Sequence, residues 1–149
     1  MDTILVSYNQ ICVFNSDMDE PFNDWNQAHV EQGFSWRQGS ASFGAIENDE
    51  TELEITTQHS YSLDNQAIRA ISVPFETESG SLIIGSIGDE REIDIEPGSY
   101  ELIFELGKRE NWWCRLTFTP QNTLLPKIIK ADQEIIKTSN FDMNAKPAA

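Results

Sequence analysis

Acidic residues alternate with aliphatic residues in three stretches of this chain, at residues 52–55, 92–96 and 101–105. Alternation with a period of two is typical of a β-strand that has one buried face and one solvated face. Residues 47–105 as a whole contain fifteen Asp or Glu and only two basic residues. The pattern therefore predicts a sheet whose outer face carries rows of carboxylates.

Short apolar runs separated by turn residues recur along most of the chain. About nine or ten such runs are visible, without a long amphipathic helix among them. Regularly spaced short strands favour an all-β fold, an antiparallel β-sandwich first and a barrel second. Residues 26–33 predict a short helix closed by Gly33, and residues 126–137 fit either a last edge strand or a short helix.

The length of 149 residues fits one domain with a single core. We expect residues 1–137 to form the sandwich. Residues 138–149 are polar and rich in small residues, which predicts a loose C-terminal tail.

The Pro97-Gly98 dipeptide predicts a turn, so residues 92–106 are expected to form a hairpin. With a two-residue loop, Asp94 would lie opposite Glu101. Two like charges in such a position destabilise a sheet, and a shifted register would still crowd carboxylates on one face.

The net charge is −15, and it is placed unevenly along the chain. Residues 1–126 hold 22 acids and 6 bases (net −16), whereas residues 127–149 hold 3 acids and 4 bases (net +1). Such a chain repels nucleic acid and attracts basic proteins, although a merely solvated acidic face is the simpler alternative. The alternation gives these candidates for contact with a basic partner: Glu52, Glu54, Glu92, Asp94, Glu101 and Glu105.

Four tryptophans are candidate anchors for a protein contact or for stacking on a sugar: Trp25, Trp36, Trp112 and Trp113. Trp112 and Trp113 are adjacent, so they face opposite sides of their strand. We expect one of them in the core and the other at least partly exposed.

No catalytic constellation is visible in the chain, and no cofactor or resident metal is expected. Cys12 and Cys114 lie inside predicted strands and are expected to be buried thiols. Residues 15–24 form an oxygen-rich loop, so a calcium- or carbohydrate-binding sandwich module is the alternative function. Without a visible signal peptide or membrane segment, we expect a cytoplasmic protein.

An ordered set of short motifs resembles the competence protein J family, the DNA-entry nuclease inhibitors of bacteria. The motifs are Ser7-Tyr8-Asn9-Gln10, Val13-Phe14, Pro21, Asp24-Trp25, Gln32-Gly33-Phe34, Ser42-Phe43, Val73-Pro74-Phe75, Pro97-Gly98-Ser99-Tyr100 and Leu102. They span about residues 5–119. The resemblance implies a bacterial inhibitor that binds a DNA-degrading nuclease and has no catalysis of its own.

The resemblance and the charge pattern point to the same mechanism. A nuclease grips DNA with positive charge, so an inhibitor that mimics DNA with an anionic face would cover that site. The resemblance does not extend to residues 120–149, whose role it leaves open.

Overall fold

The computed structural model describes residues 2–122 and 125–148, and within them the chain forms eleven strands and one short helix. The first sheet contains, in spatial order, β1 (Asp2–Leu5), β5 (Glu50–Thr57), β10 (Trp112–Pro120), β9 (Gly98–Lys108), β6 (Ala67–Thr77) and β11 (Lys127–Lys130). The second sheet contains β3 (Phe34–Arg37), β4 (Ser40–Gly44), β2 (Gln10–Asn15), β7 (Ser81–Ser86) and β8 (Asp89–Asp94). The predicted all-β fold is confirmed, with one strand more than the upper expectation.

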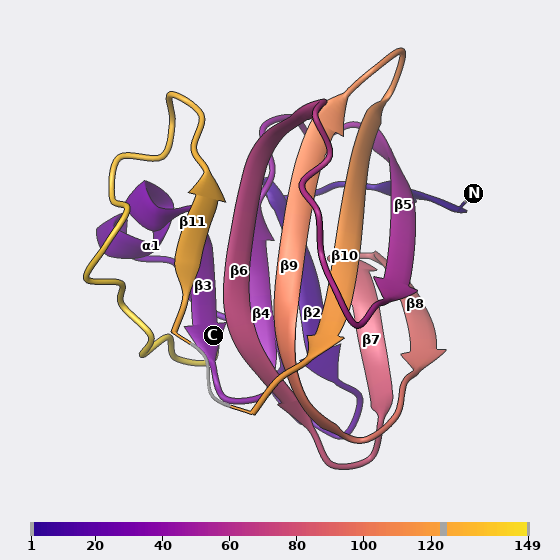
Figure 1. Ribbon diagram of the computed structural model, residues 1–149. Helices are drawn as coiled ribbons and strands as arrows, with labels where there is room; N and C mark the ends of the chain where they lie inside the picture. Colours follow the sequence, from indigo (N-terminus) through magenta and orange to yellow (C-terminus); the bar gives the residue numbers. More distant parts are fainter. Residues whose placement is uncertain (1, 123–124, 149) are drawn as a thin grey trace.

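The two sheets are stacked face to face, with the core between them (Figure 1). Phe43 of β4 stacks on Phe104 of β9 with ring centroids 4.7 Å apart, which joins the second sheet to the first. All pairings are antiparallel except that of β5 with β10, which is parallel. The inward-facing aliphatic and aromatic residues of the alternating strands form this core, as the sequence pattern predicted.

The helix α1 (Gln27–Gln32) confirms the short helix that was predicted at residues 26–33. Asn26 caps it, because its side chain accepts a hydrogen bond from the His29 backbone while the His29 ring accepts one from the Asn26 backbone. Gly33 ends the helix in the left-handed conformation, with φ of 84°. No helix in the described part of the chain is long and apolar enough to cross a membrane.

The prediction of a hairpin across Pro97-Gly98 is wrong. β8 pairs with β7 at the edge of the second sheet, whereas β9 lies between β10 and β6 in the first sheet. The connection through Pro97-Gly98 therefore crosses from one sheet to the other. Asp94 lies opposite Ser81 rather than opposite Glu101.

Residues 127–148 add an edge strand and then a covering segment to the domain. β11 pairs with β6, which selects the strand over the helix among the two options for this region. Polar composition predicted a loose tail after residue 137, but residues 138–148 are held against the domain. The backbone N–H of Ala145 donates to Trp36 O at 3.0 Å, and that of Ala148 donates to Phe22 O at 2.9 Å.

Candidate functional site

The six carboxylates predicted to contact a partner do not share one face. Glu52 and Glu54 lie on β5 and Glu101 and Glu105 on β9, all in the first sheet. The remaining two, Glu92 and Asp94, lie on β8 in the second sheet. The expected single anionic face is therefore divided, because the chain changes sheets between β8 and β9.

Glu105 is fully buried on the outer side of β9, so its predicted exposure is wrong. Its carboxylate forms an ion pair with the Arg115 guanidinium of β10 and accepts a hydrogen bond from the Asp64 backbone N–H at 2.8 Å. A carboxylate that is buried and paired in this way is engaged within the fold and is not accessible to a partner.

Glu101 is also partly neutralised by its own molecule. The Ser72 hydroxyl donates to its carboxylate at 2.6 Å, and Lys127 Nζ of β11 lies 3.8 Å away. On β5, Glu54 is exposed, and the half-buried Glu52 accepts a hydrogen bond from Asn111 at 3.2 Å. The first sheet thus offers fewer free carboxylates than its sequence suggested.

Glu92 and Asp94 are exposed on the edge strand β8. Within residues 2–122 and 125–148, neither forms an ion pair with a basic side chain. These two of the six predicted residues, like the exposed Glu54 on β5, therefore keep their charge available to a partner.

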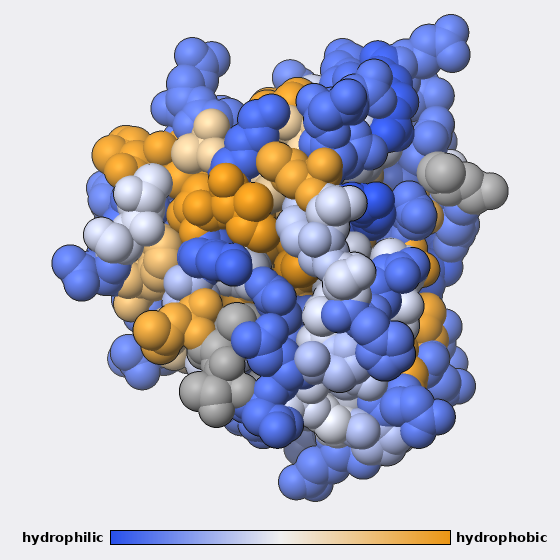
Figure 2. All heavy atoms as spheres, viewed as in Figure 1, coloured by the Kyte–Doolittle hydropathy of each residue, from blue (hydrophilic) through white to orange (hydrophobic). Residues whose placement is uncertain are grey.

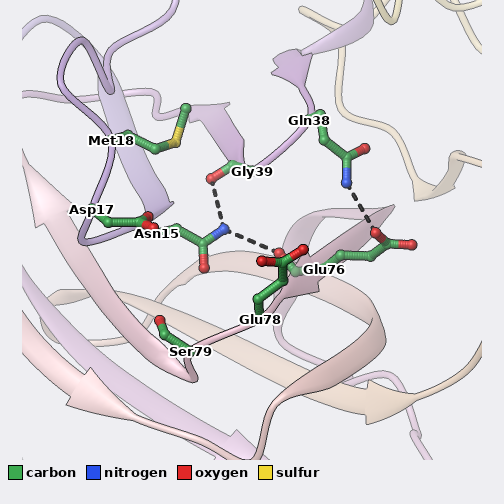
Figure 3. A pocket seen from close by; sticks show the side chains of 8 residues that line it. All are labelled: Asn15, Asp17, Met18, Gln38, Gly39, Glu76, Glu78 and Ser79. Atoms are coloured by element: carbon green, nitrogen blue, oxygen red, sulfur yellow. Dashed lines mark hydrogen bonds between the residues drawn. The ribbon is translucent and has the colours of Figure 1, made fainter.

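An acidic hollow lies beside them, and alternation alone did not identify it (Figure 3). Its volume is about 420 Å³, and Asp17, Glu76 and Glu78 contribute carboxylates to it. Asn15 holds two of its walls together, donating to Glu76 O at 3.0 Å and to Gly39 O at 3.4 Å. The sequence signal that could have located the hollow is the presence of acidic residues in or next to turns. The turns of a β-sandwich lie together at the ends of its strands.

Two further carboxylates, Asp94 and Glu96, do not line the hollow and belong to segments that adjoin it. Ser81, the residue opposite Asp94, accepts a hydrogen bond from Ser16 at 2.8 Å. Ser99, three residues after Glu96, donates to Glu76 at 3.4 Å. We call this set the acidic end, and its five exposed members are Asp17, Glu76, Glu78, Asp94 and Glu96. The loops and strand ends that carry them lie at the lower end of the molecule in Figure 1.

The structure gives no support to calcium binding by the loop at residues 15–24. In the described part of the chain, no three or more His, Cys, Asp or Glu side chains are grouped as a metal site requires. Asp24 instead accepts a hydrogen bond from the Lys146 backbone N–H at 2.9 Å, which secures the C-terminal segment.

Trp112 and Trp113 are both buried, at 8% and 4% exposure, so the expectation that one is exposed is wrong. The Lys108 ammonium lies 5.1 Å from the Trp112 ring centre, and the Arg109 guanidinium lies 4.3 Å from that of Trp113. These cations cover the rings from the β9–β10 turn. Neither tryptophan is accessible as an anchor.

Trp36 and Trp25 are half-buried, and their indole groups are held in place. Trp36 Nε1 donates to Pro74 O at 2.7 Å and packs against the core. Trp25 Nε1 donates to Gln10 at 3.1 Å, and its ring lines a second hollow near α1. Of the four predicted anchors, Trp25 is therefore the one that borders an open surface hollow.

The thiols and the buried histidine have structural environments. Cys12 and Cys114 are buried and free, as predicted, and burial raises their thiol pKa to about 11 and about 12. Thiolates are the reactive form, so neither cysteine has the character of a nucleophile. His29 is fully buried, where its Nδ1 caps α1 and its Nε2 lies 3.4 Å from Asp142.

Comparison with known proteins covers most of the sandwich. The Competence protein J (ComJ) family matches residues 3–119. A relative from Bacillus subtilis (strain 168), the DNA-entry nuclease inhibitor, is 30% identical over 98 residues, which are 65% of this chain and 74% of the relative. The crystal structure of ComJ from Bacillus subtilis, described as the inhibitor of the DNA degrading activity of NucA, superposes with a TM-score of 0.73.

That superposition covers 80% of this chain and 94% of the ComJ chain at 22% identity, and it shows a shared fold. Both relatives are described as inhibitors of a nuclease and not as enzymes, which confirms the non-enzymatic class predicted here. The match to residues 3–119 includes the strands from β2 to β9 and nearly all of β1 and β10. The chain therefore belongs to the competence protein J family.

Proposed function

We propose that this protein binds a DNA-degrading nuclease and inhibits it by occupying the surface that contacts DNA. Family membership supports the class of partner, since relatives are described as inhibitors of such a nuclease. The charge distribution supports the mode of binding. A nuclease must present Lys and Arg to phosphate, and a protein of net charge −15 is attracted to that surface over a long range.

One observation supports this mode of binding. In the described part of the chain, some carboxylates are free of ion pairs, whereas others are engaged by the protein itself. The acidic end and Glu92 are exposed and, within the described residues, form no ion pairs with basic side chains. Glu101 and Glu105 are engaged by the protein itself. We therefore assign the contact surface to the acidic end and β8, and not to the outer face of β9.

The test is a DNA-degradation assay with the host organism's purified NucA-type nuclease. We expect added inhibitor protein to stop degradation at close to equimolar amounts. The apparent affinity should fall as salt rises, because salt screens charge attraction. A nuclease that stays fully active in excess protein at low salt would contradict the proposal.

Paired charge reversals locate the contact. Glu78→Lys with Asp94→Lys should weaken inhibition and reduce its salt dependence. Glu54→Lys with Glu110→Lys changes the net charge equally on exposed positions away from the acidic end, and it should weaken inhibition less. An equal effect of the two pairs would mean that overall charge acts without a defined contact at the acidic end.

A further inference from the structure

A second hollow, of about 580 Å³, opens beside α1 at the opposite end of the strands from the acidic end. Its walls are the turn between β1 and β2, the helix α1, the end of β4 and the segment that follows β11. We call it the helix-side groove. Figure 2 shows hydrophobic atoms gathered on the side of the molecule where Figure 1 places α1 and the segment after β11.

Exposed apolar side chains are concentrated at the helix-side groove. Tyr8 and Ile136 are each 74% exposed and Val30 is 56% exposed, and all three line it together with Trp25 and Ile46. Six large hydrophobic side chains are exposed in the described residues, so this groove holds half of them. A grouped apolar surface on a highly charged protein is typical of an interaction site.

The floor of the groove is fixed by a buried ion-pair cluster. Arg69 is 3% exposed, and its guanidinium donates to Asp132 at 2.8 Å, to Glu134 at 3.0 Å and to Gly44 O at 2.8 Å. Ile135 is buried against Gly33 behind the same wall. The wall after β11 is therefore anchored to the sandwich, which makes the groove a preformed site.

The charge around the groove is negative. Among the described residues, Arg69 is the one basic residue that lines it, and two carboxylates already balance that cation. Glu134 remains 60% exposed at the rim, and the exposed Glu47 directly follows Ile46. Lys137, which follows Ile136 and is half-buried, is the cation nearest in sequence to the rim. An apolar centre with acidic edges selects an apolar side chain that has cations beside it.

One wall of the groove lies outside the part of the chain shared with the family. The family match ends at residue 119, whereas Gln133, Glu134 and Ile136 come from the segment after β11. The groove in this form is thus built from a shared sandwich and an additional segment. Such a combination can distinguish one member's partner from another's.

We propose that the helix-side groove binds an apolar side chain of the nuclease that is flanked by Lys or Arg. This inference rests on the proposed function, and it adds a second, apolar contact with the nuclease at the opposite end of the strands from the acidic end. A second copy of this chain is the less suitable occupant, because it would bring the same acidic edges and a net charge of −15 to the contact.

Calorimetry measures the dissociation constant of the complex between this protein and the purified NucA-type nuclease of the host. It is applied to the wild type and to two variants, each with a matched pair of substitutions. Val30→Ser with Ile136→Ser removes apolar side chains from the groove. Leu5→Ser with Leu63→Ser removes exposed apolar side chains elsewhere, which are 52% and 40% exposed. All four positions are exposed, so the folded state should survive, as a melting curve will show.

We expect the groove pair to weaken binding by about tenfold or more and the control pair by less than about twofold. A further variant, Glu47→Gln, tests the contribution of the acidic edge. It should reduce the affinity for the nuclease at low salt and not at high salt. Glu110→Gln, an exposed change outside the groove, serves as its control.

The possible outcomes distinguish a failure of the groove assignment from a failure of the proposed function. Equal affinity of the groove pair and the wild type for the nuclease would overturn the groove assignment and leave nuclease binding standing. A wild type that binds no nuclease would overturn both. If sedimentation shows a wild-type dimer that the groove pair abolishes, with nuclease binding unchanged, the occupant is a second copy and the inference is wrong.

Discussion

β8 and β9 follow one another in the chain and carry the same alternation of acids and aliphatic residues, yet their carboxylates differ in solvent exposure. β8 is the edge strand of the second sheet, and Glu92 and Asp94 remain exposed on it. β9 lies in the middle of the first sheet, where Glu105 is fully buried. What lies over the outer face of a strand, and not its own alternation, decides whether an outward carboxylate reaches solvent, since Glu54 on the interior strand β5 is exposed as well.

The covering of β9 comes from segments that are distant in the sequence. The segment between β5 and β6 supplies the Asp64 backbone N–H to Glu105, and β11 supplies Lys127 to Glu101. Neither β8 carboxylate receives such a cover in the described residues. The comparison teaches that acidic alternation marks the outer face of a strand and leaves open whether the face is a binding surface.

The largest effect is expected for Glu105→Ala on β9. Removing one partner of a buried ion pair leaves Arg115 and the Asp64 N–H without their acceptor, which should lower the free energy of unfolding by about 3 kcal/mol. Glu92→Ala on β8 is the matched control and should change it by less than about 0.5 kcal/mol. Urea unfolding measures the free energy of unfolding of both variants. Equal losses would contradict the proposed difference between the two strands.

An intermediate effect is expected for Glu101→Ala. This carboxylate accepts one short hydrogen bond from Ser72 and lies near Lys127, so its removal should cost about 1 kcal/mol. Asp94→Ala, at an exposed carboxylate of β8, should leave stability nearly unchanged. Thermal unfolding of both variants provides the measurement, and a larger loss for Asp94→Ala would reverse the assignment.

A smaller effect on stability is expected from the ion pair between Arg91 and Asp89 of β8. At its start, the hydrogen bond from the Arg91 guanidinium holds the pKa of the Asp89 carboxyl below its usual value, with help from the Leu5 backbone N–H. A carboxyl whose pKa is lowered by folding stabilises the protein above its usual pKa, and this contribution is lost as the pH falls below about 4.

Carboxyl NMR titration should show the Asp89 pKa returning toward its usual value in high salt and in Arg91→Gln, because the pair lies at the surface. An Asp89 pKa unaffected by both changes would show that Arg91 is not the cause.

No difference is expected between the buried thiols of the two sheets. Cys12 of β2 and Cys114 of β10 are both buried with raised thiol pKa, so neither should react with an alkylating reagent at pH 8 until the protein is unfolded. Mass spectrometry after brief labelling measures this. Fast labelling of one native thiol would show that its sheet opens more readily.

The sequence was sufficient to predict the fold class, because alternation and turn residues are local properties. The capped helix ending at Gly33 and the buried thiols were predictable for the same reason. Sheet membership was not, since Pro97-Gly98 can close a hairpin or allow a crossing between sheets. That choice depends on the pairing of β8 with β7, a contact between strands that alternation does not specify.

The candidate site was predicted only in part. Glu92 and Asp94 remain candidates because an edge strand keeps its outer face open. Glu105 and Trp113 were misjudged because Arg115 and Arg109 cover them, and such cover depends on tertiary contacts. The acidic hollow combines turns that are far apart in the chain, so only the folded structure could bring its carboxylates together.

The edge position of β8 has a further consequence, which concerns the protein when it is concentrated. Within residues 2–122 and 125–148, one side of this strand has no neighbour in its sheet, and unpaired backbone N–H and C=O groups can template growth of an intermolecular sheet. Like charges along the strand oppose that growth between identical molecules. The carboxylates of β8 therefore keep copies of this chain apart, and neutralising them should promote aggregation.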